Sequence, residues 1–519
     1  MAVKGVIKKG EYYDSVSLML VAREATKLNG VEDAALMIGT KENKSILESS
    51  GLLIEEFKGA SASESDLLIV VKAKDELLAS TAIQKVEELL KTKNLGSRES
   101  EEYMPKSLEG ALEILPDANM VIVSVAGRYA AREAMKALEH GLHVMIFSDN
   151  VPKDKAFEVK KYGREHGLLV MGPDCGTAII NGAPLGFANV VNRGDIGIVS
   201  AAGTGLQEVS CIISNAGGGI SQGIGTGGID VKKDYQGMSF LTGLEALIDD
   251  PETKVITLVS KPPHPEVLEK IGEILKKTDK PVVAAFLGAD PELVKKIGAI
   301  PAKDLEHASL LAVSISKGIS MEDFEKEIGR KDGELKELAS QLARKLTGEQ
   351  KYFRGLFQGG TLVYETQVLL KDILGGINSN APLDPSLKLE DSWKSVGHTA
   401  VDLGEDEFTV GRPHPQIDFE LRNKRILNEA NDPTVAIIYL DVVIGYGTNP
   451  NPAEELTPVI KKAREISNAI IIATVTGTDK DPQDKAKLIS MLKDAGAVVF
   501  ERNASATRLA GYILKSIGG

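Results

Sequence analysis

Cysteine, positive charge and long apolar runs are scarce in this sequence. Only two cysteines occur among 519 residues, which excludes a disulfide framework and suits a reducing cytosol. No uncharged apolar run reaches the roughly 18 residues of a membrane span, and residues 1–9 lack the apolar core of a signal peptide. We therefore expect a cytoplasmic protein without a membrane-spanning segment.

Acidic residues outnumber basic ones, and the formal net charge is −13. Non-specific nucleic-acid binding needs a basic face, so this charge argues against nucleic acid as a partner. The sequence also lacks a Walker A pattern, a dinucleotide-binding fingerprint, and any His, Cys and Asp group with metal-ligand spacing. Because these motifs are absent, we expect no metal site and cannot assign a cofactor.

Short apolar runs alternate with longer amphipathic segments along most of the chain. This alternation is typical of buried parallel strands and their crossover helices. The predicted fold class is α/β, with several parallel-sheet domains of Rossmann-like and flavodoxin-like type. The expected strands are 66–71, 118–125, 142–147, 168–171, 195–200, 255–260, 281–287, 435–440, 469–475 and 497–500.

Changes in this pattern divide the chain into several units. A polar stretch, Lys93–Glu102, is interpreted as a linker, and the last two sheet domains resemble each other loosely. Each of those two has a glycine-rich turn that opens a helix, followed by strand–helix pairs. The predicted units are an N-terminal α/β domain (1–110), a Rossmann-like domain (111–192), a parallel-sheet domain (193–320), a helical connector (321–348) and a C-terminal flavodoxin-like domain (349–519).

Two glycine-rich turns are the main candidate sites. Ser200 ends an expected strand and is followed by Gly203, Thr204 and Gly205 at a helix start. Glycine lets the backbone approach a ligand closely, and the free amides and dipole of a helix start favour an anion. We expect these residues to bind a phosphoryl group. The alternative is a tight turn that only requires small residues.

The second turn repeats this design. Gly359, Gly360 and Thr361 open a helix, and a glutamate follows each threonine at the same offset, as Glu208 and Glu365. Two helix starts of one design on different domains could converge on one phosphoryl group, so phosphate binding is predicted here too. Coincidence is the alternative.

Three further segments supply expected substrate-pocket residues. Cys175 is interpreted mainly as a packed side chain, because no pattern supplies a base for a nucleophilic thiol. The glycine cluster near residue 225 could also be a flexible loop. The predicted pocket residues are Gly172, Asp174, Cys175, Gly225, Gly227 and His264.

Arg412 and His414 lie in a polar loop that Pro413 and Pro415 stiffen. The arginine offers a planar fork for a carboxylate or phosphate, and the histidine offers acid–base chemistry near neutral pH. We predict these two as catalytic residues. The alternative is an ordinary loop with a surface histidine.

Longer motifs resemble known families. The segments GPDCGT, GDIGIVSAAGTGLQE and LEALIDDPETKVITLVSKPPHPE are similar, in order, to the α subunit of succinyl-CoA synthetase. GLFQGGTLVYET and VAIIYLDVVIGYG resemble the ligase domain of that enzyme's β subunit. The fused whole resembles the FdrA family over nearly the entire chain, through KKGEYYDSVSLML, ANMVIVSVAGRYAAREA, VMIFSDNV, LLVMGPDCGT, FTVGRPHPQIDFELRN and TVTGTDKDPQ.

The resemblance implies a CoA-binding-type domain at 111–192 and two ligase-type domains after it. It further implies a subunit of oxamate carbamoyltransferase, a multi-subunit enzyme of allantoin breakdown in purine nitrogen degradation. That reaction interconverts oxalurate plus phosphate with oxamate plus carbamoyl phosphate. The implied ligands are carbamoyl phosphate or phosphate and a small carboxylate substrate, and the implied partners are the other subunits.

Two departures separate the chain from succinyl-CoA synthetase. Ala289–Val294 replaces the phosphohistidine loop, the nearest histidine being His307 at a later helix start, and no ATP-grasp domain is recognisable. Both favour carbamoyl transfer, because carbamoyl phosphate is already activated and needs only fixed donors and an oriented acceptor. The alternatives are an NDP-forming acyl-CoA ligase subunit, which would use CoA or a nucleotide, and a non-catalytic scaffold subunit.

Overall fold

The computed structural model describes residues 1–11, 13, 15–58, 62–63, 66–95, 105, 107–409 and 412–518. These residues form two compact units: Met1–Ile114 with Glu405–His414, and Leu115–Gly404 with Pro415–Gly519. Most of the expected linker Lys93–Glu102 lies outside the described residues. In the described part of the chain, no helix combines the length and apolar character that membrane crossing requires.

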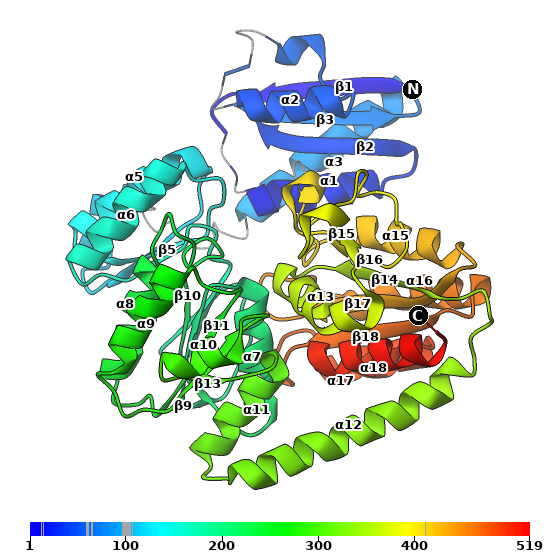
Figure 1. Cartoon of the computed structure of the whole chain (residues 1–519). Helices are drawn as coiled ribbons and strands as arrows, with labels where there is room; N and C mark the ends of the chain where they lie inside the picture. The colour runs from blue at the N-terminus through cyan, green and yellow to red at the C-terminus, as the bar shows by residue number, and fades with distance from the viewer. Residues whose placement is uncertain are drawn as a thin grey trace. The chain divides into compact units, whose positions relative to one another are not determined.

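The first unit contains a three-stranded antiparallel sheet in the order β1-β3-β2 (Figure 1). Its central strand is buried on both faces: Leu67, Ile69 and Val71 pack with α1 and α3, and Leu68 and Val70 pack with α2 and η1. Only the central strand was predicted. The elements are β1 (Ala2–Lys8), α1 (Ser15–Thr26), β2 (Val31–Ile38), α2 (Lys41–Ser49), η1 (Glu55–Phe57), β3 (Leu67–Ala73), α3 (Glu76–Leu95), α4 (Leu108–Ile114) and α14 (Asp406–Thr409).

The second unit begins with a small parallel sheet in the order β4-β5-β6. The predicted β-α-β-α-β sequence is confirmed there, since buried alanines of α5 and buried residues of α6 face its strands. The elements are β4 (Met120–Val123), α5 (Gly127–Glu139), β5 (His143–Ile146), α6 (Lys153–Glu165) and β6 (Val170–Met171).

Residues 177–316 form what we call the first lobe, a seven-stranded sheet in the order β13-β12-β11-β9-β10-β7-β8. The hairpin of β7 and β8 precedes the expected boundary at 192–193 but pairs antiparallel with β10. The elements are β7 (Thr177–Ile180), β8 (Ala183–Gly186), β9 (Arg193–Ser200), α7 (Gly203–Asn215), β10 (Ile220–Gly225), α8 (Met238–Asp249), β11 (Val255–Ser260), α9 (Pro265–Leu275), β12 (Val282–Phe286), α10 (Pro291–Lys296), β13 (Ile300–Pro301) and α11 (Leu305–Ser316).

Residues 352–516, apart from 405–414, form the second lobe, a six-stranded parallel sheet in the order β15-β16-β14-β17-β18-β19. The three strands predicted here are confirmed as β17, β18 and β19. The elements are β14 (Tyr352–Phe357), α13 (Gly360–Leu374), β15 (Asn378–Ser379), η3 (Pro385–Leu387), β16 (Thr399–Asp402), α15 (Glu420–Ala430), β17 (Val435–Val443), α16 (Pro452–Ile466), β18 (Ile470–Thr476), α17 (Lys485–Asp494), β19 (Val498–Phe500) and α18 (Asn503–Ser516).

The two lobes share one topology. The order β13-β12-β11-β9-β10 in the first lobe corresponds strand by strand to β19-β18-β17-β14-β16 in the second. The first strand of each set, β9 or β14, is followed three residues later by α7 or α13. The loose resemblance noted in the sequence is therefore a structural duplication.

The predicted helical connector is α12 (Met321–Ala343), which packs along α18 (Figure 1). Its apolar residues Phe324, Leu335, Ala339 and Leu342 join a hydrophobic core that includes residues of both lobes. The α/β fold class with several parallel sheets is thus confirmed, and the two lobes are packed together rather than strung apart.

Candidate functional site

The starts of α7 and α13 meet, as the sequence suggested. The Thr361 N–H donates a hydrogen bond to the Thr204 hydroxyl oxygen over 3.3 Å. A Cβ at Gly359 would lie 2.9 Å from Thr204 Oγ1, and one at Gly205 would lie 3.0 Å from Thr361 Cγ2. Both positions are glycine because any side chain would push the helix starts apart.

The α7 turn presents open donors. Within the described residues, the N–H groups of Gly203, Thr204 and Gly205 have no hydrogen-bond acceptor, as is usual for a first helical turn. Gly203 is exposed and Thr204 is half-buried. Ser200 contributes differently from expectation, because its hydroxyl bonds to both the N–H and the carbonyl of Ala202 and so shapes the turn.

The α13 turn is flanked by two carboxylates. Asp441, in β17, accepts the N–H groups of Gln358 (2.7 Å) and Gly359 (2.9 Å). Asp402, at the end of β16, accepts the Gly404 N–H at 2.9 Å, and its Oδ2 lies 2.7 Å from where a Cβ on Gly360 would stand. The positive end of α13 therefore already faces negative side chains.

Arg422 compensates part of this charge. Its Nη1 donates to the Asp441 carbonyl and lies 3.6 Å from Asp441 Oδ1, with both side chains fully buried. Burial raises the pKa of Asp441 to about 6, whereas Arg422 and the two N–H groups favour its ionised form. Arg422 Nε and Nη2 have no partner among the described residues.

One helical turn below each threonine lies a buried glutamate. Glu208 accepts the Asn503 N–H (2.8 Å) and the Thr476 hydroxyl, and Glu365 accepts the Leu305 N–H (2.7 Å) and the Asn503 side-chain amide (2.8 Å). Burial raises the pKa of Glu208 to about 7 and that of Glu365 to about 8.

The predicted pocket glycines serve close packing. A Cβ at Gly225 would lie 2.1 Å from the Thr177 carbonyl, one at Gly227 2.2 Å from the Pro173 carbonyl, and one at Gly172 2.3 Å from the Ile146 carbonyl. Gly225 ends strand β10, so that part of the cluster is no flexible loop. Asp174, at φ +56°, is exposed on the turn between β6 and β7 that also contains Gly172.

Cys175 lies in the hydrophobic core, and His264 lies at the start of a helix. Burial of Cys175 raises the pKa of its thiol to about 12, which keeps the thiol protonated at neutral pH. His264 caps α9, with Nδ1 accepting the Glu266 N–H at 3.4 Å. His307 is 6% exposed inside α11, with Nε2 3.3 Å from Glu325, and forms no exposed loop.

Arg412 and His414 belong to the first unit, whereas the glycine turns belong to the second. His414 is half-buried, and burial lowers its pKa to about 4, so the imidazole is neutral at pH 7. Val410 and Gly411 of this loop lie outside the described residues.

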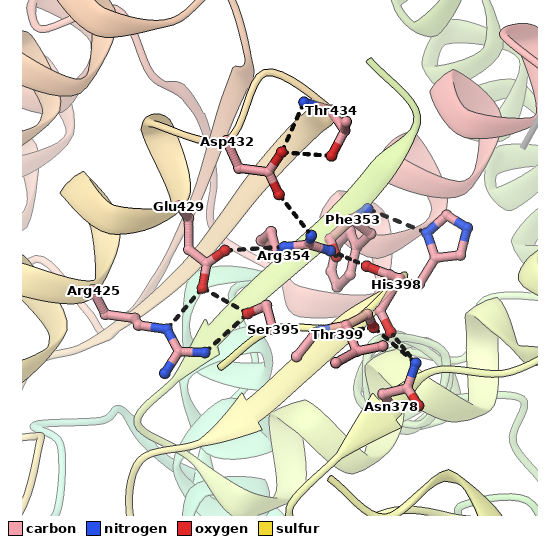
Figure 2. A network of polar contacts seen from close by, with 12 residues as sticks. Phe353, Arg354, Asn378, Ser395, His398, Thr399, Arg425, Glu429, Asp432 and Thr434 are labelled. Carbon is pink, nitrogen blue, oxygen red and sulfur yellow. Dashed lines mark hydrogen bonds and ion pairs between the residues drawn. The ribbon is translucent and has the colours of Figure 1, made fainter. Parts of the chain in front are cut away.

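A second polar network lies near the start of β14. Figure 2 shows Glu429 between Arg354 (3.0 Å) and Arg425 (2.7 Å), with Asp432 also on Arg354 (3.1 Å). Both arginines hold carbonyls of the loop before β16, and His398 accepts the Phe353 N–H. This network lies near the amino end of β14, away from the glycine turn, so we assign it to loop support.

A cavity of about 640 Å³ opens between the end of α7 and the loop after β18. Lys485 Nζ pairs there with Asp479 (3.3 Å) and Glu501 (2.8 Å), and Lys480 Nζ donates to Asn192 (2.8 Å). None of the predicted site residues lines it.

Comparisons with known proteins agree with this architecture. A CoA-ligase family model matches residues 356–513, and a model described as "AllF, heavy metal-associated domain" matches residues 1–105. Residues 356–513, which cover most of the second lobe, therefore resemble a CoA-ligase domain, and residues 1–105 resemble an AllF-type N-terminal domain.

A more specific relationship comes from whole-chain similarity. The Escherichia coli (strain K12) protein named "Uncharacterized protein YahF" is 41% identical over 515 residues, which is 98% of each chain. The chain therefore belongs to the same family as YahF.

Other relatives match part of the chain. The succinate–CoA ligase (ADP-forming) subunit alpha of Methanothermobacter thermautotrophicus is 29% identical over 35% of this chain and 61% of that protein. The mitochondrial subunit alpha-2 of Trichomonas vaginalis is 30% identical over 39% of this chain and 64% of that protein. The structure of ATP citrate lyase from Methanothrix soehngenii matches 42% of each chain, with 19% identity and a TM-score of 0.34.

The residues of the AllF-type domain do not fit a heavy metal, despite the description of its family model. Residues 1–105 contain neither cysteine nor histidine, the ligands that soft and borderline metals prefer. Across the described residues, no group of three or more His, Cys, Asp or Glu side chains could hold an ion. We therefore derive no metal chemistry for this domain.

Sequence reasoning missed Asp402, Asp441 and Asn503. The equal spacing from each threonine to Glu208 or Glu365 was visible, but Asn503, the partner that both glutamates share, lies 295 residues from Glu208 and 138 residues from Glu365 along the chain. Nothing in a local pattern reveals such contacts.

Proposed function

We propose that the chain is a subunit of a carbamoyl-transferring enzyme that interconverts oxalurate plus phosphate with oxamate plus carbamoyl phosphate. The observation that supports this most is the meeting of two glycine-rich helix starts, with open N–H groups at Gly203–Gly205. Helix starts are favourable sites for phosphate. The FdrA resemblance supplies the reaction.

The chemistry needs no nucleotide. The amide nitrogen of oxamate attacks the carbonyl carbon of carbamoyl phosphate, the carbon–oxygen bond to phosphate breaks, and the amide proton ends on the departing phosphate. Donors fixed at the phosphate stabilise the charge that this step leaves there. In the proposal Gly203, Thr204 and Gly205 act as these donors.

Arg412 and His414 are assigned to the other substrate. A planar guanidinium matches a carboxylate bidentately, so Arg412 would hold oxamate, and a neutral His414 would accept a hydrogen bond from its amide. We expect Arg412→Ala in the assembled enzyme to raise the KM for oxamate with little change in the KM for carbamoyl phosphate. Unchanged oxamate kinetics would remove the assignment.

The first test is thermal unfolding of the full chain with phosphate, carbamoyl phosphate, CoA and ATP in turn. A ligand that binds only the native state stabilises it by about 2.7 kcal/mol at one hundred times its Kd. We expect a higher Tm with phosphate and carbamoyl phosphate. A shift with CoA or ATP alone would contradict carbamoyl transfer.

The second candidate is an acid–thiol ligase subunit. It is favoured by the CoA-ligase family match and by relatives named succinate–CoA ligase. It predicts CoA binding and a phosphorylated histidine in the complex, whereas His307 is buried within α11. Mass spectrometry of the complex after ATP treatment separates the two candidates.

A further inference from the structure

Asn503, the first residue of α18, touches both helices of the glycine turns. Its backbone N–H donates to Glu208 Oε1 of α7 at 2.8 Å, and its Nδ2 donates to Glu365 Oε2 of α13 at 2.8 Å. The same Nδ2 lies 3.2 Å from the Leu362 carbonyl and 3.3 Å from the Thr366 hydroxyl of α13. One residue thus bonds to both helices.

The orientation of Asn503 is itself fixed. The Tyr439 hydroxyl, from β17, donates to Asn503 Oδ1 at 2.6 Å and to its carbonyl at 3.2 Å. Asn503, Glu208, Glu365 and Tyr439 all have almost no exposure. A buried network with satisfied partners has few alternative arrangements, so it holds its members rigidly.

The glutamates cap across the lobes in a reciprocal way. Glu208 of the first lobe accepts the first N–H of α18 in the second lobe, and Glu365 of the second lobe accepts the first N–H of α11, at Leu305, in the first. These bonds satisfy donors that a helix start leaves open. Asn503 and Leu305 are the residues whose N–H groups are capped. The side chain of Asn503 also bonds to Glu365, the glutamate that caps Leu305.

The network lies one helical turn below the contact between the lobes' turns. Glu208 follows Thr204 by four residues and Glu365 follows Thr361 by four, so each lies on the same face of its helix as its threonine. A slide or rotation of either helix would change the 3.3 Å contact from Thr361 N to Thr204 Oγ1. Resting on the proposed function, we infer that Asn503 is a positioning residue that sets the spacing between the phosphate-binding turn of α7 and the α13 turn that contacts it.

The test uses the full chain with Asn503→Ala and a matched control. Alanine keeps the backbone bond to Glu208 and removes the side-chain bonds to α13 together with the bond from the Tyr439 hydroxyl. Asn215→Ala is the control, because Asn215 Nδ2 ties the other end of α7 to the second lobe through the Gly477 carbonyl at 2.9 Å. Asn503→Ser retains a short donor and serves as a second variant if alanine does not fold.

Calorimetric titration with inorganic phosphate gives the main result. We expect Asn503→Ala to weaken phosphate binding about tenfold or more, since small misplacement of binding groups has large effects. The phosphate affinity of Asn503→Ser should lie between those of the parent chain and Asn503→Ala. Asn215→Ala should bind phosphate as tightly as the parent chain does. A lower Tm for Asn503→Ala with a phosphate Kd within about twofold of the parent would show a merely structural role and overturn the inference.

Amide hydrogen exchange distinguishes this inference from the proposed function. Exchange at the Thr361 N–H should be faster in Asn503→Ala than in the parent chain. In Asn215→Ala it should be unchanged. If the parent chain binds no phosphate, the proposed function fails, yet faster exchange at Thr361 still supports positioning by Asn503. Unchanged exchange at Thr361 would overturn the positioning role whatever the ligand.

Discussion

The two glycine turns have the same backbone and opposite electrostatics. Ser200 and Phe357 hold equivalent places before α7 and α13, and the register pairs Ser200 with Gly225 and Val259. Phe357 pairs with Asp402, and Asp441 follows the Leu440 that pairs with Leu356. The first turn therefore has uncharged neighbours where the second has two aspartates.

This difference indicates unequal roles for a duplicated element. An anion is attracted to the open N–H groups of α7, whereas Asp402 and Asp441 oppose an anion at α13. In the proposed enzyme the phosphate would lie toward Gly203–Gly205, and α13 would mainly shape the site. Topology alone would have predicted two equal binding turns.

The largest expected effect comes from making the second turn like the first. Asp441→Val copies Val259, but it leaves the buried Arg422 without its carboxylate and two N–H groups without an acceptor. Breaking a buried ion pair costs about 3–5 kcal/mol, which we expect as a lower free energy of unfolding in urea. The double variant Asp441→Val, Arg422→Met should recover the part of the loss that comes from the unpaired Arg422, but not the part from the two N–H groups. A loss below about 1 kcal/mol for Asp441→Val alone would contradict the ion pair's role.

The buried glutamates extend the comparison to pH. Burial raises the pKa of Glu208 to about 7 from its ordinary value of 4.5, so between these two pH values the native state holds a proton that the unfolded state releases. The contribution of Glu208 to the free energy of unfolding is complete below about pH 4.5 and is lost as pH rises through 7, a loss of about 3 kcal/mol. We expect Glu208→Gln, which cannot ionise, to flatten the fall in unfolding free energy between pH 5 and 8. Parallel pH curves for parent and variant would contradict this.

Separating the turns should weaken phosphate binding. Gly205→Val would press on Thr361 Cγ2 and Val259 Cγ1, 3.0 and 3.2 Å from the new Cβ, and would move the helix starts apart. We expect about a tenfold loss in phosphate affinity by calorimetry. Gly228→Ala is the control, because its Cβ would meet only the Ala201 carbonyl at 3.8 Å. Equal losses in both variants would point to a general disturbance of the first lobe.

The smallest expected effect sharpens the electrostatic contrast. Asp402→Asn keeps the acceptor for the Gly404 N–H and removes a negative charge beside α13. We expect phosphate to bind about two- to fivefold more tightly at low salt, and the gain to shrink at high salt. Asp479→Asn removes a charge that is 79% exposed and should change nothing measurable. A weaker affinity for Asp402→Asn would show that this carboxylate helps binding.

The sequence predicted the parallel strands that are continuous apolar runs, such as 255–260 and 435–440, because such runs are typical of strands buried on both faces. It missed the parallel strands β13, β14, β15 and β16. It missed β1 and β2, the two edge strands of their sheet, whose residues are mostly half-buried and which therefore lack a continuous apolar run. It missed β10 as well, where glycines obscure the apolar run because the turn before β7 packs against its backbone. These elements depend on neighbours that local composition does not reveal.

The candidate site was predicted in part. The repeated order of glycine, threonine and glutamate correctly indicated that two helix starts are related, and the structure brings them together. Asp441 lies inside an apolar strand run, where its side chain looks like an isolated polar residue until its bonds to Gln358 and Gly359 are known. Partners that lie far apart in sequence are outside the reach of spacing arguments.

Helix α12 connects the two lobes, and therefore the two glycine turns, within one chain. Turns on separate chains would meet only by association, at a rate and extent set by protein concentration. Joined by this 23-residue helix, they face each other at an effective concentration that the connection itself sets. Dilution therefore leaves the pair of turns assembled, and every translated chain carries both in a one-to-one ratio.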